Sequence, residues 1–309
     1  MRNYECKLQI VTPIIMGGAR KNSLELREQS INGILRWWFR FYGGLKYQDL
    51  QDLQKRESEV FGSTNRAKRF YIRILQKPQS TEKAYLCMND RRKKGENGAV
   101  ANYNERVRTS YAPNQEFILN FRFMPHFLKE YEKDLKNSIL CLSLFGGIGA
   151  RWRRGFGSIV VEEFILCGEE LEEIKKEINE KLMELNIQRD VSKIKPLQEF
   201  INFTNTKIFL IKPKNEFWDS YESAMNDLRD NFYRALKHEL KTSEVSYSPK
   251  GSKRKTSPLI IQIKKNAKNH YFGVILVWQW QEWPQKKPVE DFLTKLKNYE
   301  FIEINPPGE

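Results

Sequence analysis

Polar and apolar residues alternate at the start of the chain and predict a β-strand there. In residues 4–12, YECKLQIVT, hydrophobic side chains recur at every second position, the period of a strand with one buried face. Similar patterns predict further strands in the first half of the chain, at 69–75, 116–123 and 158–166.

Between these strands the apolar residues follow a helical period. In SINGILRWWFRFYGG, residues 30–44, they recur every three or four positions, Ser30 is the predicted N-cap, and Gly43 and Gly44 end the helix. A more polar helix is predicted at 47–61 and another at 127–144, while the basic stretch 89–108 is predicted to be a loop. Without the polar helix and the loop, the order is β-α-β-β-α-β.

The second half repeats this order of elements without repeating the sequence. It begins with an acidic helix predicted at 169–185. The strands that follow are predicted at 207–213, 258–265, 271–280 and 300–304, and the helices at 217–241 and 288–298. We therefore expect an α+β fold with two ferredoxin-like (RRM-like) βαββαβ domains in tandem, at residues 1–167 and 168–309.

The charge of the chain indicates what kind of partner it binds. The 309 residues contain 53 Lys and Arg against 39 Asp and Glu, a net charge of +14. Residues 66–73 hold four basic side chains and 245–281 hold seven, neither with an acid, whereas 162–184 holds nine glutamates and three lysines. Segregated positive charge favours anion-binding faces and is typical of nucleic-acid binders. No apolar run approaches the roughly 20 residues of a membrane span, so we expect a cytoplasmic protein with no membrane contact.

Metal and cofactor chemistry has little support in the sequence. The four cysteines are spread along the chain without a CxxC pair, and the three histidines, His126, His238 and His270, are far apart. We therefore predict no metal, no cofactor and no catalytic residue, although a site assembled in three dimensions stays open.

The glycine-rich stretch LFGGIGARWRRGFGSIVV, residues 144–161, does not fit a nucleotide cradle. A P-loop requires a lysine and a hydroxyl after its last glycine, and the dinucleotide fingerprint requires a strand before it and a helix after it. Here a predicted helix precedes the stretch and a predicted strand follows it. We interpret it as a loop whose glycines allow close approach and whose Arg151, Arg153 and Arg154 bind phosphates. The alternative is a tight connection with solvated arginines. The alternation of side chains also means that the three arginines need not all face the same way.

The tryptophan-containing helix has two distinct sides. Its core stripe contains Ile31, Ile34, Leu35, Trp38 and Phe41 or Tyr42, and its other side contains Gly33, Arg36, Trp37 and Arg40. An aromatic ring between two arginines is a plausible base-stacking platform with phosphate clamps. The alternative is an aromatic that covers the sheet, and for Trp38 that alternative is favoured. Gly17, Gly18, Arg20 and Lys21 form a second basic loop just before this helix.

Three motifs together resemble a known family. TPIIMGG (12–18), ELREQSINGILRWWFR (25–40) and FGGIGARWRRGFGS (145–158) are similar to segments of the RAMP superfamily of CRISPR-associated proteins, and within it to the first subunit of the Cmr (type III-B) RNA-guided effector complexes. The resemblance implies tandem ferredoxin-like domains and a noncatalytic role in antiviral defence. It also implies contact with guide or target RNA near the 3′ end of the guide, beside other RAMP subunits of the Cmr complex. The RNA-binding candidates are Gly17, Gly18, Arg20, Lys21, Arg36, Trp37, Trp38, Arg40, Gly147, Gly149, Arg151, Arg153, Arg154 and Gly155.

Two other functions remain open at this point. Some RAMP relatives cut RNA, so the chain could be a metal-free, guide-processing endoribonuclease in which His126, after a predicted strand, serves as the general base. It could also be an architectural subunit whose basic surface faces neighbouring proteins.

Overall fold

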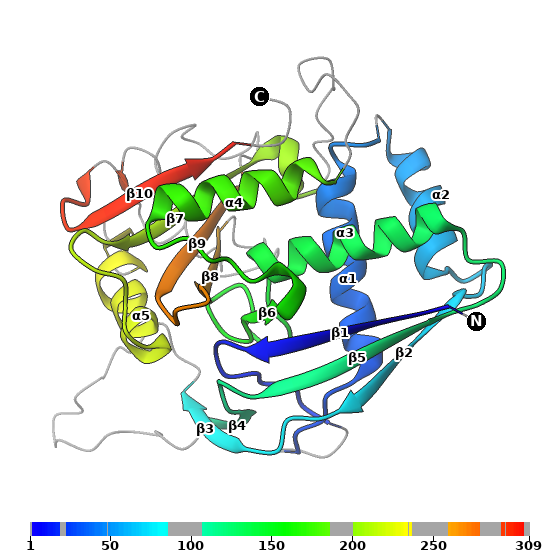
Figure 1. The fold of residues 1–309 in the computed structure, drawn as a ribbon, viewed down its shortest axis with the longest axis horizontal. Coiled ribbons are helices and arrows are strands. Elements are labelled where there is room, and N and C mark those ends of the chain that lie inside the picture. The colour runs from blue at the N-terminus through cyan, green and yellow to red at the C-terminus, as the bar shows by residue number, and fades with distance from the viewer. Residues whose placement is uncertain are drawn as a thin grey trace, which may run out of the picture.

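Two four-stranded antiparallel sheets and their helices make up the fold (Figure 1). The computed structural model describes residues 2–18, 23–47, 49–85, 107–185, 200–233, 235–236, 259–278, 292–293 and 295–305. None of the helices in these ranges is long and apolar enough to cross a bilayer.

The first sheet has the strand order β2-β5-β1-β6, and all neighbours are antiparallel. Its strands are β1 (Asn3–Ile10), β2 (Phe70–Gln76), β5 (Glu116–Phe123) and β6 (Ile159–Val161). Helices α1 (Glu28–Gly43) and α3 (Lys129–Phe145) pack on one face, and α2 (Leu50–Phe61) packs beside them. The predicted N-cap at Ser30 is wrong, because α1 begins two residues earlier, after an extended Arg27 whose side chain caps nothing.

The second sheet has the order β10-β7-β9-β8 and is covered on both faces. Its strands are β7 (Thr206–Pro213), β8 (Leu259–Lys265), β9 (Tyr271–Trp278) and β10 (Tyr299–Ile304). One face packs toward α4 (Leu171–Met183) and the first half of the chain. The other face packs toward α5 (Tyr221–Asp227) and the π-helical turn Leu228–Tyr233 that continues it. Burial on both faces explains why β9 is an almost continuous apolar run.

Several boundaries differ from the prediction. The predicted strand 158–166 is only the short β6, followed by the 3₁₀ turn Glu162–Phe164. Strands β3 (Thr81–Tyr85) and β4 (Val107–Tyr111) form a hairpin that is a separate two-stranded sheet. This hairpin was not predicted, because both strands are short and polar and their apolar residues alternate only weakly. The residues between β3 and β4, which include most of the predicted loop 89–108, lie outside the described residues. Of the predicted helix 288–298, residues 292, 293 and 295 are helical, residues 296–298 lead into β10, and residues 288–291 and 294 lie outside the described residues.

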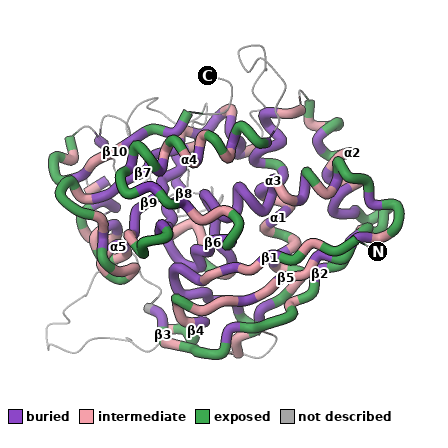
Figure 2. Tube along the Cα trace, in the orientation of Figure 1, coloured by how far each residue is buried: buried purple, intermediate pink, exposed green. Residues whose placement is uncertain are grey.

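The two halves share a core. One cluster of buried side chains joins the first sheet and its helices to β7, β9 and β10, and Figure 2 shows buried positions running through both sheets. Lys264 of β8 lies in this region, 1% exposed, and its ammonium donates hydrogen bonds to the carbonyl oxygens of Gly146 (2.7 Å) and Ile159 (2.8 Å). Burial lowers the pKa of this lysine well below its usual value. The boundary between residues 167 and 168 therefore stays a prediction.

Candidate nucleic-acid interface

A groove of about 400 Å³ brings the three sequence motifs together. The first loop contributes Gly17, α1 contributes Trp37, and the glycine–arginine loop contributes Trp152 and Arg153. The remaining lining residues are Ile15, Met16, Arg27, Ser30, Gly33, Ile34, Gly149 and Ala150. Segments that are far apart in the sequence thus form one continuous surface.

Arg153 lies against two indole rings in this groove. Its guanidinium carbon is 5.5 Å from the centroid of the Trp37 ring and 5.3 Å from that of Trp152, within cation–π range. The two rings meet edge to face at 5.2 Å. The Arg153 side chain makes no hydrogen bond or ion pair with any described residue, and burial lowers the pKa of its guanidinium. The groove therefore holds a partly desolvated positive charge that no described carboxylate balances.

Backbone hydrogen bonds fix the glycine–arginine loop on both sides. The Ala150 N–H donates to the carbonyl of Ile15 at 2.6 Å, which ties the loop to the segment after β1. On the other side, the Gly155 N–H donates to the carbonyl of Ile261 at 2.7 Å, and the Gln262 side chain donates to the carbonyl of Trp152. Both of these partners belong to β8, so the second sheet helps to hold the groove.

The glycines of this loop are required by the chain's own packing. Gly157 has φ +65°, and a Cβ there would lie 1.8 Å from the Ile148 carbonyl oxygen. Gly149 has φ +87°, and a Cβ there would lie 2.6 Å from the Ile15 carbonyl oxygen. The candidates Gly147 and Gly155 also lie in buried backbone of the loop. The close approach that we predicted for RNA is thus made by protein backbone, and RNA contact at Gly147, Gly149 and Gly155 stays a prediction.

The other arginines of the loop have different surroundings from Arg153. Arg151 is exposed at the turn, with φ +58°. Arg154 donates a hydrogen bond to the Tyr233 hydroxyl at 3.1 Å and lies 5.7 Å from the centroid of that ring. Neither lines the groove, so Arg153 is the loop arginine best placed to meet a ligand there.

Arg36 and Arg40 share a buried carboxylate. Glu57 of α2 accepts from the Arg36 Nε at 2.8 Å, and from the Arg40 Nε and Nη2 at 2.6 and 2.8 Å. Burial alone would raise the pKa of Glu57, but these hydrogen bonds outweigh it and hold the pKa below its usual value. Both guanidinium groups thus join α1 to α2, and phosphate contact at Arg36 and Arg40 stays a prediction. A single carboxylate for two cations leaves a surplus positive charge.

The two tryptophans of α1 occupy different environments. Trp38 is completely buried, with its ring against Phe41, Phe145 and Trp152. The expectation from the resemblance that Trp38 faces RNA is thus not met in this structure, and the assignment of Trp38 to the core stripe holds. Trp37 is half-buried and lines the groove.

The first loop is only partly described. Gly17 is exposed at the groove, and nothing lies within 4 Å of a Cβ added there. Gly18 closes the loop through a hydrogen bond from its N–H to the Ser23 carbonyl at 2.9 Å. The candidates Arg20 and Lys21 lie outside the described residues.

Sequence reasoning missed two polar residues of the groove, Arg27 and Ser30. Arg27 directly precedes α1 and is exposed. Because Ser30 was predicted to be the N-cap of the helix, it was not counted among the RNA-binding candidates. A helix that starts at Glu28 would have placed Ser30, Gly33 and Trp37 on one side by their three- and four-residue spacing.

The described residues offer no assembled catalytic or metal centre at the predicted histidine. His126 is exposed in the turn between β5 and α3, and its side chain makes no hydrogen bond or ion pair with them. Within the same part of the chain, no group of three His, Cys, Asp or Glu side chains could hold a metal ion.

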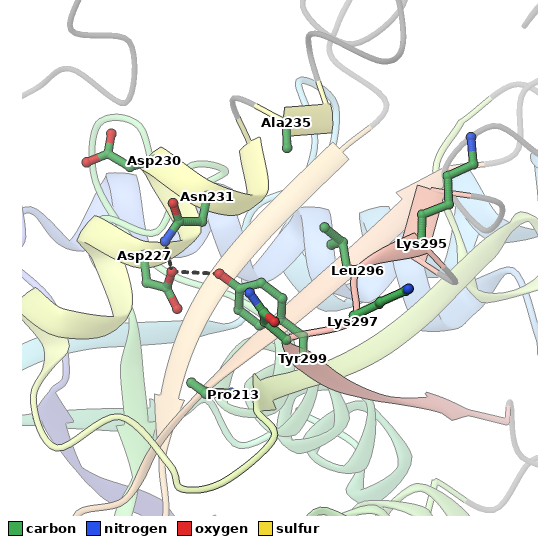
Figure 3. Close-up of a pocket in the computed structure, with 10 residues that line it drawn as sticks. Pro213, Asp227, Asp230, Asn231, Ala235, Lys295, Leu296, Lys297 and Tyr299 are labelled. Atoms are coloured by element: carbon green, nitrogen blue, oxygen red, sulfur yellow. Dashed lines mark hydrogen bonds between the residues drawn. The ribbon is translucent and has the colours of Figure 1, made fainter.

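A second pocket of about 780 Å³ lies beside β10 (Figure 3). On its wall the Asp227 carboxylate accepts hydrogen bonds from the Tyr299 hydroxyl and the Asn231 amide, both at 2.6 Å. Asp230, also on this wall, is paired with Arg229 at 2.7 Å. Lys295 and Lys297 also line this pocket, so its two carboxylates offset its two ammonium groups and its lining carries less net positive charge than the groove does.

Comparisons with known proteins agree with the three motifs. Residues 7–160 match the protein family described as the RAMP superfamily. Cmr subunit Cmr1-2 of Pyrococcus furiosus is 37% identical over 67 residues, which cover 21% of this chain and 36% of that protein. Cmr subunit Cmr1-1 of the same organism is 29% identical over 149 residues, which cover 44% of this chain and 40% of that protein. The chain thus spans less than half the length of the curated relatives that it matches.

Solved structures match over a larger share of the chain. The apo crystal structure of Cmr1 from Pyrococcus furiosus has a TM-score of 0.66 at 18% identity and is covered along its whole length, as is this chain. A chain from a cryo-EM structure of the type III-B Cmr-beta complex bound to cognate target RNA and AMPPnP has a TM-score of 0.60 at 14% identity, with 94% of this chain and 98% of that chain covered. At these identities the likeness concerns the fold, which is a mixed α and β fold with antiparallel sheets.

Proposed function

We propose, from the match of residues 7–160 to the RAMP superfamily, that the protein is a single-stranded RNA-binding subunit of a type III-B CRISPR (Cmr) effector complex that takes part in antiviral defence. The proposal places the RNA in the groove between the first loop, α1 and the glycine–arginine loop. It assigns no catalytic residue to the chain.

One observation carries the RNA assignment, namely the unbalanced guanidinium of Arg153 between Trp37 and Trp152. A partly buried cation without a carboxylate is costly, and a phosphate in the groove would relieve that cost with charge-assisted hydrogen bonds. The indole of Trp37 offers a surface for a base, and stacking of one base on an aromatic ring contributes about 1 to 3 kcal/mol. Stacking requires an unpaired base, which favours a single strand over a duplex.

The partners follow from the relatives. The matched curated proteins are named as Cmr subunits, and a structure of similar fold belongs to a Cmr complex bound to target RNA. We propose that this chain likewise contacts guide or target RNA near the 3′ end of the guide, beside other RAMP subunits. The net charge of +14 supports a polyanionic partner.

We also propose that each sheet with its helices is one ferredoxin-like unit. In such a unit the strands lie in the order fourth, first, third, second. Counting the strands of each four-stranded sheet along the chain, both sheets follow this order, β6-β1-β5-β2 in the first and β10-β7-β9-β8 in the second. Of the helix that would precede β10, residues 292, 293 and 295 are helical in the described part of the chain.

Salt dependence of RNA affinity tests the assignment. The logarithm of the affinity for a labelled single-stranded RNA should fall with the logarithm of salt concentration by about 0.7 per phosphate neutralised. Arg153→Gln should lower the affinity and flatten this slope by about one phosphate. The matched control is Arg229→Gln, because Arg229 is paired with Asp230 outside the groove. Salt-insensitive binding, or an equal effect of both variants, would contradict the proposal.

Incubation with CRISPR repeat RNA tests the noncatalytic assignment. The RNA should stay intact. Specific cleavage that His126→Ala abolishes would replace this proposal with the endoribonuclease. Binding to other Cmr subunits without any RNA affinity would favour the architectural role.

A further inference from the structure

A second basic and aromatic surface lies on the outer face of the first sheet, away from the groove. In RFYIR, residues 69–73, the alternation of strand β2 sends Phe70 and Ile72 into the core and leaves Tyr71 and Arg73 on the opposite side, and Arg69, which directly precedes the strand, is exposed. Tyr71, at 53%, is one of four large hydrophobic side chains that are exposed in the described part of the chain.

The neighbouring strand extends this surface. Tyr71 of β2 lies opposite Arg122 of β5, and Arg73 lies opposite Asn120. Residues directly opposite each other in an antiparallel pair share one face, with Cβ atoms about 5 Å apart. Arg122 is exposed. We call Arg69, Tyr71, Arg73 and Arg122 the outer-face patch.

Two arginines of the patch, Arg69 and Arg73, have no carboxylate partner among the described residues. The side chains of Arg69 and Arg73 form no hydrogen bond or ion pair with the described residues, whereas Lys7 on the same face is paired with Glu116 at 2.9 Å. Arg69 directly precedes β2 and Arg73 lies within it, with Tyr71 between them, so the Cα atoms of the two arginines are separated by at most roughly 13 Å. An aromatic ring between two unpaired cations is complementary to a base and its flanking phosphates.

We propose that the outer-face patch is a second binding surface for single-stranded RNA, in which Tyr71 stacks on a base and Arg69 and Arg73 contact phosphates. Single-stranded RNA is the occupant that this arrangement favours, because the Arg69 and Arg73 guanidinium groups can meet phosphates while the Tyr71 ring between them meets a base. Leu75, which follows the patch on β2, is a large apolar side chain that is 56% exposed. The inference goes beyond the proposed function, since it concerns the face of the sheet opposite α1 and α3 and does not require the groove.

Binding of short and long single-stranded RNAs tests the inference. Tyr71→Ala and Arg73→Gln should weaken binding of a long RNA that can reach both surfaces, with a loss for Tyr71→Ala of about 5- to 150-fold, the factor that corresponds to one stacked base. Binding of a short RNA that occupies only the groove should not change. Tyr71→Phe should retain most of the affinity. Lys7→Gln is the matched control, because Lys7 lies on the same face but is already paired.

The same measurements on Trp37→Ala separate the two surfaces. If Trp37→Ala weakens binding of both RNAs while Tyr71→Ala and Arg73→Gln change neither, the outer-face patch is not an RNA surface and the groove stands. If only the patch variants weaken binding, the patch stands and the groove assignment fails. If the patch variants keep RNA affinity but lose binding to another Cmr subunit, the patch is a protein interface and the inference is overturned.

Discussion

The guanidinium of Arg153 lies 5.5 Å from the centroid of the Trp37 ring, although one residue belongs to a loop and the other to a helix. This contact predicts that the two side chains act together on RNA. Trp37→Ala should lower RNA affinity by about 1 to 3 kcal/mol through lost stacking, and Trp37→Phe by less. Trp37 also packs against Phe41, 5.7 Å between ring centroids, so thermal unfolding should be measured beside fluorescence anisotropy. Equal losses of affinity for Ala and Phe would contradict stacking.

Gly33 allows stability and binding to be separated. It lies inside α1 at the groove, with nothing within 4 Å of an added Cβ. Gly33→Ala should stabilise the protein by about 0.8 to 1 kcal/mol, because alanine is the better helix former. Gly33→Leu should project into the groove and reduce RNA affinity while the fold is retained. Urea unfolding and RNA titration of both variants check this, and unchanged affinity of Gly33→Leu would argue against RNA at this wall.

Gly157→Ala should have the opposite effect on stability. Both the positive φ and the carbonyl of Ile148 oppose a side chain there, and we expect a loss of about 2 to 4 kcal/mol from strain and clash. Urea unfolding measures it. A loss below 1 kcal/mol would show that the loop can relax around the new methyl group.

Glu57 should make stability depend on acid pH. Its pKa is lowered in the folded protein because Arg40 and Arg36 outweigh the effect of burial. Since a depressed carboxyl pKa stabilises the fold above the unfolded value of about 4.3, this contribution should be present at neutral pH and lost as pH falls through the folded pKa. Glu57→Gln should be less stable at pH 7 by about 1 to 3 kcal/mol. The difference from wild type should shrink on acidification, which urea unfolding across pH can follow.

Lys264 should give a dependence of the same sign, stability rising with pH, over a more alkaline range. Its folded pKa lies well below the ordinary value near 10.4, so between the two values the unfolded chain binds more protons and stability should rise with pH. Lys264→Met should remove this rise and leave the Gly146 and Ile159 carbonyls without their donor, at a cost of about 2 to 4 kcal/mol. Stability that is independent of pH in both proteins would contradict a buried, titrating ammonium.

The sequence predicted much of the fold, because hydrophobic periodicity is strong wherever an element has one buried face. Strand β5 alternates cleanly and the buried stripe of α1 includes Trp38 as expected. The resemblance to the RAMP superfamily, drawn from three short motifs, is confirmed. The hairpin of β3 and β4 was missed because its strands carry little apolar signal.

The site was only partly predictable, since partners distant in sequence decide what each side chain does. Arg36 and Arg40 lie beside Trp37 on the helical wheel, but only the fold brings Glu57 to them. Arg151 and Arg153 are equivalent in the motif, yet only Arg153 lies between two indoles. A glycine in a motif indicates that another group approaches the backbone closely, but it does not say whether that group is a ligand or the protein itself. At Gly149 and Gly157 the group is a carbonyl oxygen of the protein's own backbone.

The hydrogen bonds between the glycine–arginine loop and β8 impose an order on biosynthesis. Residues 153–155 leave the ribosome well before Ile261, and at 5 to 20 residues per second the delay is roughly 5 to 20 s. During that interval the loop lacks the strand that holds Gly155 and the Trp152 carbonyl. A nascent chain would therefore have the RAMP motifs before it has a finished groove, and RNA capture would begin only after the second sheet has docked.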